Sequence, residues 1–195
     1  GPGVDPLQAV TIPVGATAVF GLQWDQPYAS ATGGAGAAND LDLVLVGPSL
    51  SPLAVSINNN IGRNPVEVLQ YTNPGPGTTF MLAVAHLRGP VPQLFKYVYF
   101  GPGVTVDEYT THSSTIYGHA SAVGATAIGA AFYAQTPAFG RVPPRLEPFS
   151  AGGPVSILFD GTDQPVIDVR RKPELVAPDG TNNTFFGKDI PDPGD

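Results

Sequence analysis

Short apolar segments separated by turn-forming residues make up the chain from its N-terminus to about residue 102. Glycine, proline and asparagine interrupt these segments every 8–14 residues or so, a spacing typical of an all-β sandwich (about 8–12 residues between turns). The segments expected to form strands are Ala9–Val14, Thr17–Trp24, Leu41–Val46, Leu53–Ile57, Val66–Thr72, Thr78–Ala85 and Leu94–Phe100. Between the second and third of them, Tyr28–Asn39 is rich in Ala, Gly and Ser and is expected to be a surface loop.

Apolar and polar residues alternate along several of these segments. Because successive side chains of a strand point to opposite faces, the alternation predicts sheets with one buried face and one wet face. Asp40 and Asp42 lie opposite a row of leucines and are expected to face solvent. The inward rows are expected to be Ala18, Phe20, Leu22 and Trp24; Leu41, Leu43 and Leu45; and Phe80, Leu82 and Val84.

The pattern changes after residue 102, where the apolar residues become smaller and proline-rich loops appear. Pro178-Asp179-Gly180 is a strong turn signal that ends the last expected strand. The elements expected here are a short helix over Ser113–Ala122 with Ser113 or Ser114 as its N-cap, a buried strand over Ala122–Gly129, a loop over Thr136–Arg145, a turn over Phe149–Pro154 and a short strand over Leu175–Ala177.

Three motifs in this second part occur in a recognisable order. Ala120-Ser121-Ala122-Val123-Gly124-Ala125-Thr126 precedes Phe149-Ser150-Ala151-Gly152-Gly153-Pro154, which precedes Arg171-Lys172-Pro173-Glu174-Leu175-Val176-Ala177-Pro178-Asp179-Gly180. The order resembles the approach to the nucleophile in subtilisin-like serine peptidases. In that family a buried VGA strand leads to an FSSxGP turn, then to a KPDIxAPG strand and turn, and then to the GTS motif with the catalytic serine. Gly152 and Asp179 depart from this pattern.

The resemblance covers about residues 113–187 and implies a partial α/β segment of a catalytic domain. By position, the family's catalytic Asp, His and oxyanion-hole Asn are expected before Gly1, and its Ser after Asp195. No catalytic, cofactor-binding or metal-binding residue is therefore assigned in this chain. The resemblance implies a secreted serine endopeptidase, acting on protein or peptide substrates, to which this chain contributes scaffold.

The first part resembles a second family. Asn39–Leu45, Pro65–Leu69 and Gly77–Val84 are similar to the strand rows of pre-peptidase C-terminal type jelly rolls, which some subtilisin-like enzymes carry as an insertion. The expected fold is therefore mainly β: an antiparallel jelly-roll-like β-sandwich over residues 1–102, followed by a partial α/β subtilisin-like segment over residues 103–195.

Composition narrows the choice of partners. The chain has no cysteine, a net charge of −7 and a pI of about 4.7, which argues against nucleic acid because phosphate contacts require clustered Lys and Arg. The one basic cluster, Arg170-Arg171-Lys172, belongs to the motif that enters the last strand. No apolar run approaches the ~20 residues that span a membrane, so no membrane partner is expected.

A self-contained catalytic group is an alternative source of activity. Asp107, His112, Ser113, Ser114 and His119 lie close together in the sequence, but no G-x-S-x-G elbow accompanies them. The alternative for His119 is a half-buried helix residue bonded to a backbone carbonyl. His86 is expected to be a solvated residue at the end of a strand.

A non-catalytic binding module for protein, glycan or calcium is the other alternative. Asp25, Asp40 and Asp42 could supply carboxylates to calcium, although no D-x-D-x-D-G loop is present. No other cofactor is expected. Asn182-Asn183-Thr184 matches the N-glycosylation pattern. Aromatic residues that could form a sugar-binding face, or pack in the core, are Trp24, Tyr28, Tyr71, Tyr97 and Tyr99.

Overall fold

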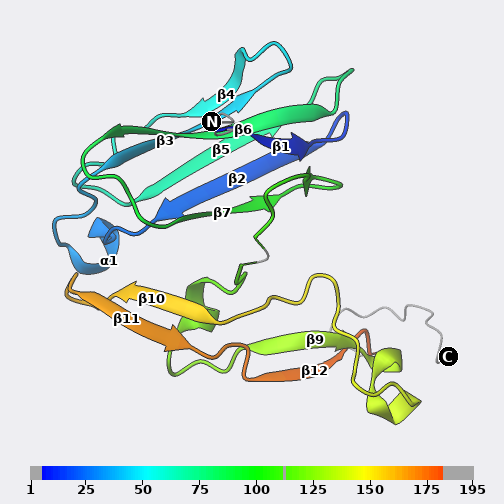
Figure 1. Cartoon of the computed structure of the whole chain (residues 1–195). Coiled ribbons are helices and arrows are strands. Elements are labelled where there is room, and N and C mark those ends of the chain that lie inside the picture. Colours follow the sequence, from blue (N-terminus) through cyan, green and yellow to red (C-terminus); the bar gives the residue numbers. More distant parts are fainter. Residues whose placement is uncertain (1–5, 112, 182–195) are drawn as a thin grey trace, which may run out of the picture. The chain divides into compact units, whose positions relative to one another are not determined.

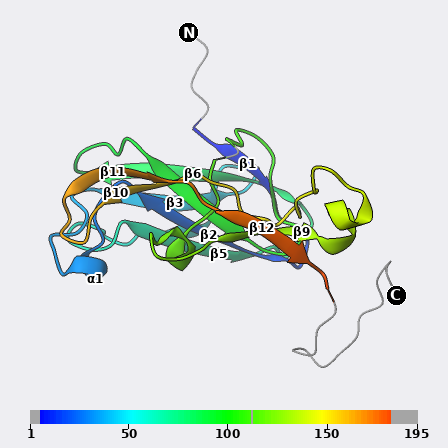
Figure 2. The same cartoon turned by 90° about the horizontal axis from the view of Figure 1, so that it is seen from below.

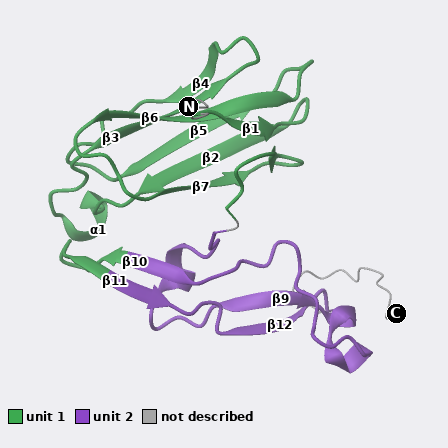
Figure 3. Cartoon of the chain, viewed as in Figure 1, with its two compact units in different colours: residues 1–111, 158–166 green, residues 112–157, 167–195 purple. Residues whose placement is uncertain are grey.

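The computed structural model describes residues 6–111 and 113–181 of the chain. It divides into two compact units (Figure 3). Unit 1 comprises residues 1–111 and 158–166, and unit 2 comprises residues 112–157 and 167–195. The fold is mainly β.

Unit 1 is a sandwich of two antiparallel sheets, drawn as two layers of arrows in Figure 1. The larger sheet has the strand order β4-β3-β6-β1-β8, and the smaller has the order β5-β2-β7. The strands are β1 (Gln8–Thr11), β2 (Thr17–Trp24), β3 (Asp40–Val46), β4 (Pro52–Ser56), β5 (Val66–Thr72), β6 (Thr79–Arg88), β7 (Phe95–Phe100) and β8 (Thr105–Val106).

The core of unit 1 is formed by the alternating residues of these strands. The three inward rows expected from the sequence are confirmed: Ala18, Phe20, Leu22, Trp24, Leu41, Leu43, Leu45, Phe80 and Leu82 are all buried, and Val84 packs against them. Tyr71 and Tyr97 also pack against this cluster. Burial of this apolar area from both sheets supplies the main driving force for folding of the unit.

The expected strands of unit 1 all form, with ends shifted by a few residues. β6 is longer than expected and runs to Arg88, and β3 begins at Asp40. Two elements were not expected. The short helix α1 (Ala29–Thr32) lies in the segment expected to be a loop, and β8 adds an edge to the larger sheet through its pairing with β1.

Unit 2 contains a parallel pair of strands. β9 (Ile128–Phe132) pairs with β12 (Leu175–Asp179) in register from Leu175–Ile128 to Asp179–Phe132. Figures 1 and 2 show the two strands side by side. Short 3-10 helices flank them: η1 (Gly118–Ser121), η2 (Tyr133–Gln135) and η3 (Pro137–Phe139). β10 (Val155–Phe159) pairs with β11 (Pro165–Arg170) in a separate sheet, and the turn between them is grouped with unit 1.

Two expectations for this part of the chain are corrected. The helix expected over Ser113–Ala122 is only the single 3-10 turn η1. The buried strand expected over Ala122–Gly129 begins at Ile128 instead, and Val123 is 82% exposed. Residues 125–127 are held as a loop by polar contacts with distant side chains, which local apolar character does not reveal.

Candidate functional site

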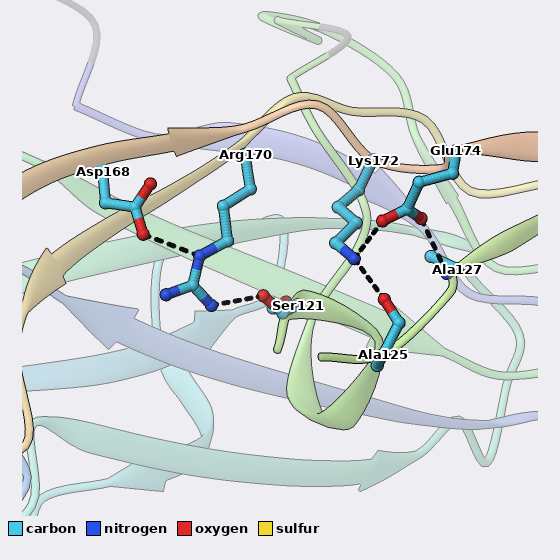
Figure 4. A network of polar contacts seen from close by, with 7 residues as sticks. All are labelled: Ser121, Ala125, Ala127, Asp168, Arg170, Lys172 and Glu174. Atoms are coloured by element: carbon cyan, nitrogen blue, oxygen red, sulfur yellow. Dashed lines mark hydrogen bonds and ion pairs between the residues drawn. The ribbon is translucent and has the colours of Figure 1, made fainter. Parts of the chain in front are cut away.

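The three motifs that carry the peptidase resemblance contact one another at one buried lysine of unit 2, Lys172. Figure 4 shows its contacts with residues of the first and third motifs. The side chain of Lys172 is only 3% exposed. Its ammonium group donates hydrogen bonds to the carbonyl oxygen of Ala125 and to the Glu174 carboxylate. Lys172 therefore ties the chain entering β12 to the loop that precedes β9.

Glu174 completes this connection. Its Oε2 accepts a hydrogen bond of 2.8 Å from the amide of Ala127, and its own amide donates to the Ala127 carbonyl at 3.0 Å. We call Lys172, Glu174 and the backbone of residues 125–127 the Lys172 clamp. The clamp fixes the start of β12 against the start of β9, which sets the register of the parallel pair.

The electrostatics of the clamp keep Glu174 ionised. The hydrogen bond from Lys172 lowers the pKa of the Glu174 carboxyl below its ordinary value, and the amide of Ala127 adds to this effect. Because the Lys172 ammonium already bonds to two oxygens, it is not placed to act as a general base. The clamp can position backbone, but it presents no nucleophile.

A second pair extends the polar contacts along β11. Arg170 forms an ion pair with Asp168 at 2.8 Å, from Nε to Oδ2, and its Nη1 donates to the carbonyl of Ser121 at 2.6 Å. Two of the three residues of the basic cluster thus bond to the segment 121–125, which lies far from them in the sequence (Figure 4). Arg170 and Lys172 of the basic cluster therefore hold segments of unit 2 together.

The glycine-rich motif also contacts the clamp. A side chain at Gly153 is excluded, because its Cβ would lie 1.6 Å from the carbonyl oxygen of Lys172. The amide of Ala130, in β9, donates to the Ser150 hydroxyl at 3.0 Å. The sequence singled out all three motifs, but it did not indicate that Lys172 is buried.

Unit 1 holds a second polar group, formed by the carboxylates of β3. Asp40 and Asp42, expected to face solvent, are 4% and 8% exposed. The register of the β3–β6 pairing shifts between Asp40 and Leu41, as at a β-bulge, and Asp40 accepts a hydrogen bond of 3.0 Å from the amide of Asn60. The loop between β4 and β5 thus covers Asp40, for which the alternation alone predicts exposure to solvent.

Glu67 is the most deeply buried acid of unit 1. It is fully buried, and its Oε2 accepts hydrogen bonds from the Ser56 hydroxyl and, at 2.9 Å, from the Asn58 amide. Its Oε1 has no hydrogen-bond partner among the described residues. Desolvation raises the pKa of Asp42, and the charges of Asp40 and Glu67 raise it further.

These carboxylates are not arranged as a metal centre. Within residues 6–111 and 113–181, no three His, Asp or Glu side chains are placed to hold one cation. Asp25, the third member of the expected calcium set, instead accepts hydrogen bonds from the amides of Gln93 and Leu94 at 3.0 and 3.2 Å. The arrangement of the side chains in the described part of the chain therefore does not support the calcium hypothesis.

The local catalytic alternative is not assembled within one unit. Asp107 belongs to unit 1, where its carboxylate accepts hydrogen bonds of 2.7 Å from the hydroxyls of Thr11 and Thr105. His119 belongs to unit 2 and is exposed in η1, not half-buried as expected. His112 lies outside the described residues. His86 is exposed near the end of β6, as expected.

The aromatic residues of unit 1 pack mainly inward. The Trp24 indole donates to Asn39 at 2.6 Å, Tyr71 stacks edge-on against Phe80, and burial raises the pKa of Tyr97 to about 12, helped by nearby Tyr99. Packing in the core, the other interpretation of these residues, accounts for Trp24, Tyr71 and Tyr97, whereas Tyr99 is 42% exposed. Asn182-Asn183-Thr184 lies outside the described residues.

Comparison of the sequence and the structure with family models, curated proteins and solved structures gives no match. In the described part of the chain, no helix has both the length and the apolar character required to cross a bilayer.

Proposed function

We propose that this chain is part of a secreted subtilisin-like serine endopeptidase, in which it contributes scaffold and not catalytic groups. The observation that carries the proposal is the parallel pairing of β9 with β12. The resemblance implies a partial α/β segment of a catalytic domain, and the strands of such a segment form a mostly parallel sheet. The parallel pair of β9 and β12, with β12 in the motif that resembles KPDIxAPG, fits this expectation.

The contacts among the motifs add to this support. Lys172 bonds to Ala125 of the first motif region, and Gly153 of the second motif abuts the Lys172 carbonyl. The contacts thus join three segments that lie far apart in the sequence into one architecture. In the proposed enzyme, this architecture would hold the turn after β12 in place for a serine further along the polypeptide.

The exposure of the parallel pair also favours a larger catalytic domain. Parallel sheets are ordinarily covered on both faces, because their crossover connections place helices there. Ile128, Leu175 and Val176 are 59%, 47% and 42% exposed. In the proposed enzyme, further strands and helices would cover these side chains, and the sandwich of unit 1 would be an insertion.

The proposal is tested first by the coding sequence around the chain. It predicts an AAGN-like strand shortly before Gly1 and a GTS motif, followed by Pro-His, shortly after Asp195. A continuous reading frame that lacks both would refute the proposal and favour the binding-module alternative.

A labelling experiment tests the chemistry. A fluorophosphonate probe should label the full-length product at the downstream serine and should leave residues 1–195 unlabelled, since nucleophile and oxyanion donors are needed together for reaction. Labelling of Ser113 or Ser114 would instead show that the local group is catalytic.

A further inference from the structure

One loop of unit 2 carries apolar side chains on its surface. Residues 133–146 leave β9 and return beside it, where Leu146 bridges Ala131. The next amide, that of Glu147, donates to the carbonyl of Ala130 at 2.9 Å. A compact surface segment whose ends meet in this way is an Ω-loop, a kind of loop that is frequently functional. We refer to it as the 133–146 loop.

Its conformation is fixed by its own contacts. The amide of Arg145 donates to the carbonyl of Gln135 at 3.0 Å, and the amides of Phe139 and Arg141 both donate to the carbonyl of Thr136. The rings of Tyr133 and Phe139 meet edge to face, with centroids 5.3 Å apart. A surface held in one conformation loses less conformational entropy when it binds a partner.

The 133–146 loop exposes both apolar side chains and positive charge. Val142, Phe139 and Leu146 are 77%, 58% and 52% exposed. Arg141 and Arg145 are exposed between them, and neither takes part in the ion pairs found in the described residues. In a chain of net charge −7, two exposed arginines that form no ion pair within the described residues are a local concentration of positive charge.

We propose that the 133–146 loop is a docking surface for an extended acidic peptide segment that also carries apolar side chains. Arginine binds carboxylates through paired, charge-assisted hydrogen bonds. Arg141 and Arg145 flank Val142, so carboxylates of the segment would meet the guanidinium groups while an apolar side chain covers the valine. Pro143 and Pro144 have fixed φ angles and hold this spacing.

A short peptide fits this surface better than an extended polyanion does. Each Lys or Arg near an anionic bilayer contributes only about 1 kcal/mol, and the rest of this acidic chain would be repelled by a charged membrane or nucleic acid. At ordinary salt, charges more than roughly 10 Å from a bound peptide are largely screened. The acidic remainder of the chain therefore repels a short peptide little. The docking surface belongs to unit 2 alone, so the inference does not depend on the peptidase proposal.

The test uses residues 1–195 and a fluorescein-labelled octapeptide of alternating Glu and Leu, with binding followed by fluorescence anisotropy. Saturable binding should weaken as NaCl is raised from about 50 to 300 mM, and an octapeptide of alternating Gln and Leu should bind at least about tenfold more weakly. The double variant Arg141→Glu/Arg145→Glu should lose about tenfold or more in affinity. The matched double variant Arg63→Glu/Arg88→Glu, which changes net charge equally, should bind like the wild type.

The apolar contribution is measured separately. Val142→Ser should weaken binding of the Glu-Leu peptide, whereas Val91→Ser, at an equally exposed site of unit 1, should not. Equal binding by the two arginine double variants overturns the proposal, as does equal binding of the Gln and Glu peptides. Binding of vesicles of phosphatidylcholine and phosphatidylserine in place of the peptide also overturns it. If the glutamate double variant fails to fold, Arg141→Gln/Arg145→Gln, which removes both charges without adding new ones, should also weaken binding, and wild-type affinity in that variant overturns the proposal.

Discussion

The indole nitrogen of Trp24 donates a hydrogen bond of 2.6 Å to the side-chain oxygen of Asn39, and both residues are buried. The amide nitrogen of Asn39 in turn donates to the carbonyl of Pro90 at 2.8 Å. Asn39 immediately precedes β3 and Trp24 ends β2. The asparagine thus connects strands of the two different sheets at one end of the sandwich.

Asn39→Ala should lower the free energy of unfolding of unit 1 by about 1–3 kcal/mol, because it leaves the buried indole N–H and the Pro90 carbonyl without partners. Trp24 is the only tryptophan of the chain, so urea unfolding followed by its fluorescence measures this unit directly. Asn59→Ala, at an exposed position, is the control and should change the midpoint little. Equal midpoints for the two variants would show that the Trp24–Asn39 bond does not stabilise the fold.

Asp42 should make the stability of unit 1 decrease as pH rises. Its folded-state pKa is raised above 3.8 by desolvation and by the charges of Asp40 and Glu67. The folded state therefore binds the proton more tightly than the unfolded state does, and its ionisation destabilises the fold. The loss of stability begins near pH 3.8 and is complete above the raised folded-state pKa.

Asp42→Asn removes this effect while preserving the side-chain shape. The variant should match the wild type at pH values below 3.8 and should be more stable at pH 7, as measured by urea midpoints across that range. The control is Asp168→Asn, which removes a carboxylate of unit 2 and should leave the pH dependence of unit 1 unchanged. A difference between Asp42→Asn and the wild type that is constant with pH would contradict the assignment.

Most strands of unit 1 could be predicted because several alternate apolar and polar residues and turn-forming residues separate them. Phe20 and Leu43, for example, lie where period-two alternation places them. The burial of Asp40 could not be predicted, since it depends on Asn60 in a loop about twenty residues away in sequence and on a bulge within β3. Neither feature leaves a local signal.

The candidate site in unit 2 was located by its motifs but not by its geometry. The small apolar residues before Ile128 predicted a strand that starts too early, because nothing local shows that Lys172 and Glu174 hold the backbone of Ala125 and Ala127 as a loop. Lysine is rarely buried unless it is paired. Glu174 is only two residues from Lys172, but the Ala125 carbonyl, the other partner of Lys172, lies 47 residues away in the sequence.

Lys172→Met should loosen the start of the parallel pair. It leaves the Ala125 carbonyl and one Glu174 oxygen without the ammonium donor, at a cost of about 1–3 kcal/mol. Hydrogen exchange of the Ala127 and Glu174 amides, whose acceptors lie within the Lys172 clamp, should become faster. The neighbouring Arg171→Met removes an exposed charge and should leave both amides protected; equal acceleration in the two variants would rule out a specific role for Lys172.

Gly153 and Gly152 provide a matched pair for testing how tightly the glycine-rich motif packs on the clamp. A Cβ at position 153 would lie 1.6 Å from the Lys172 carbonyl oxygen, whereas a Cβ at position 152 would have no heavy atom within 4 Å. Gly153→Ala therefore forces the backbone of one segment to move, at a cost typical of overpacking, about 1–3 kcal/mol. Limited proteolysis of residues 1–195 should cut unit 2 faster in Gly153→Ala, while Gly152→Ala should be cut at the wild-type rate. Equal cleavage rates in the two variants would mean that the glycine-rich motif and Lys172 are not in contact in solution, and the convergence of the three motifs would then lose its strongest steric support.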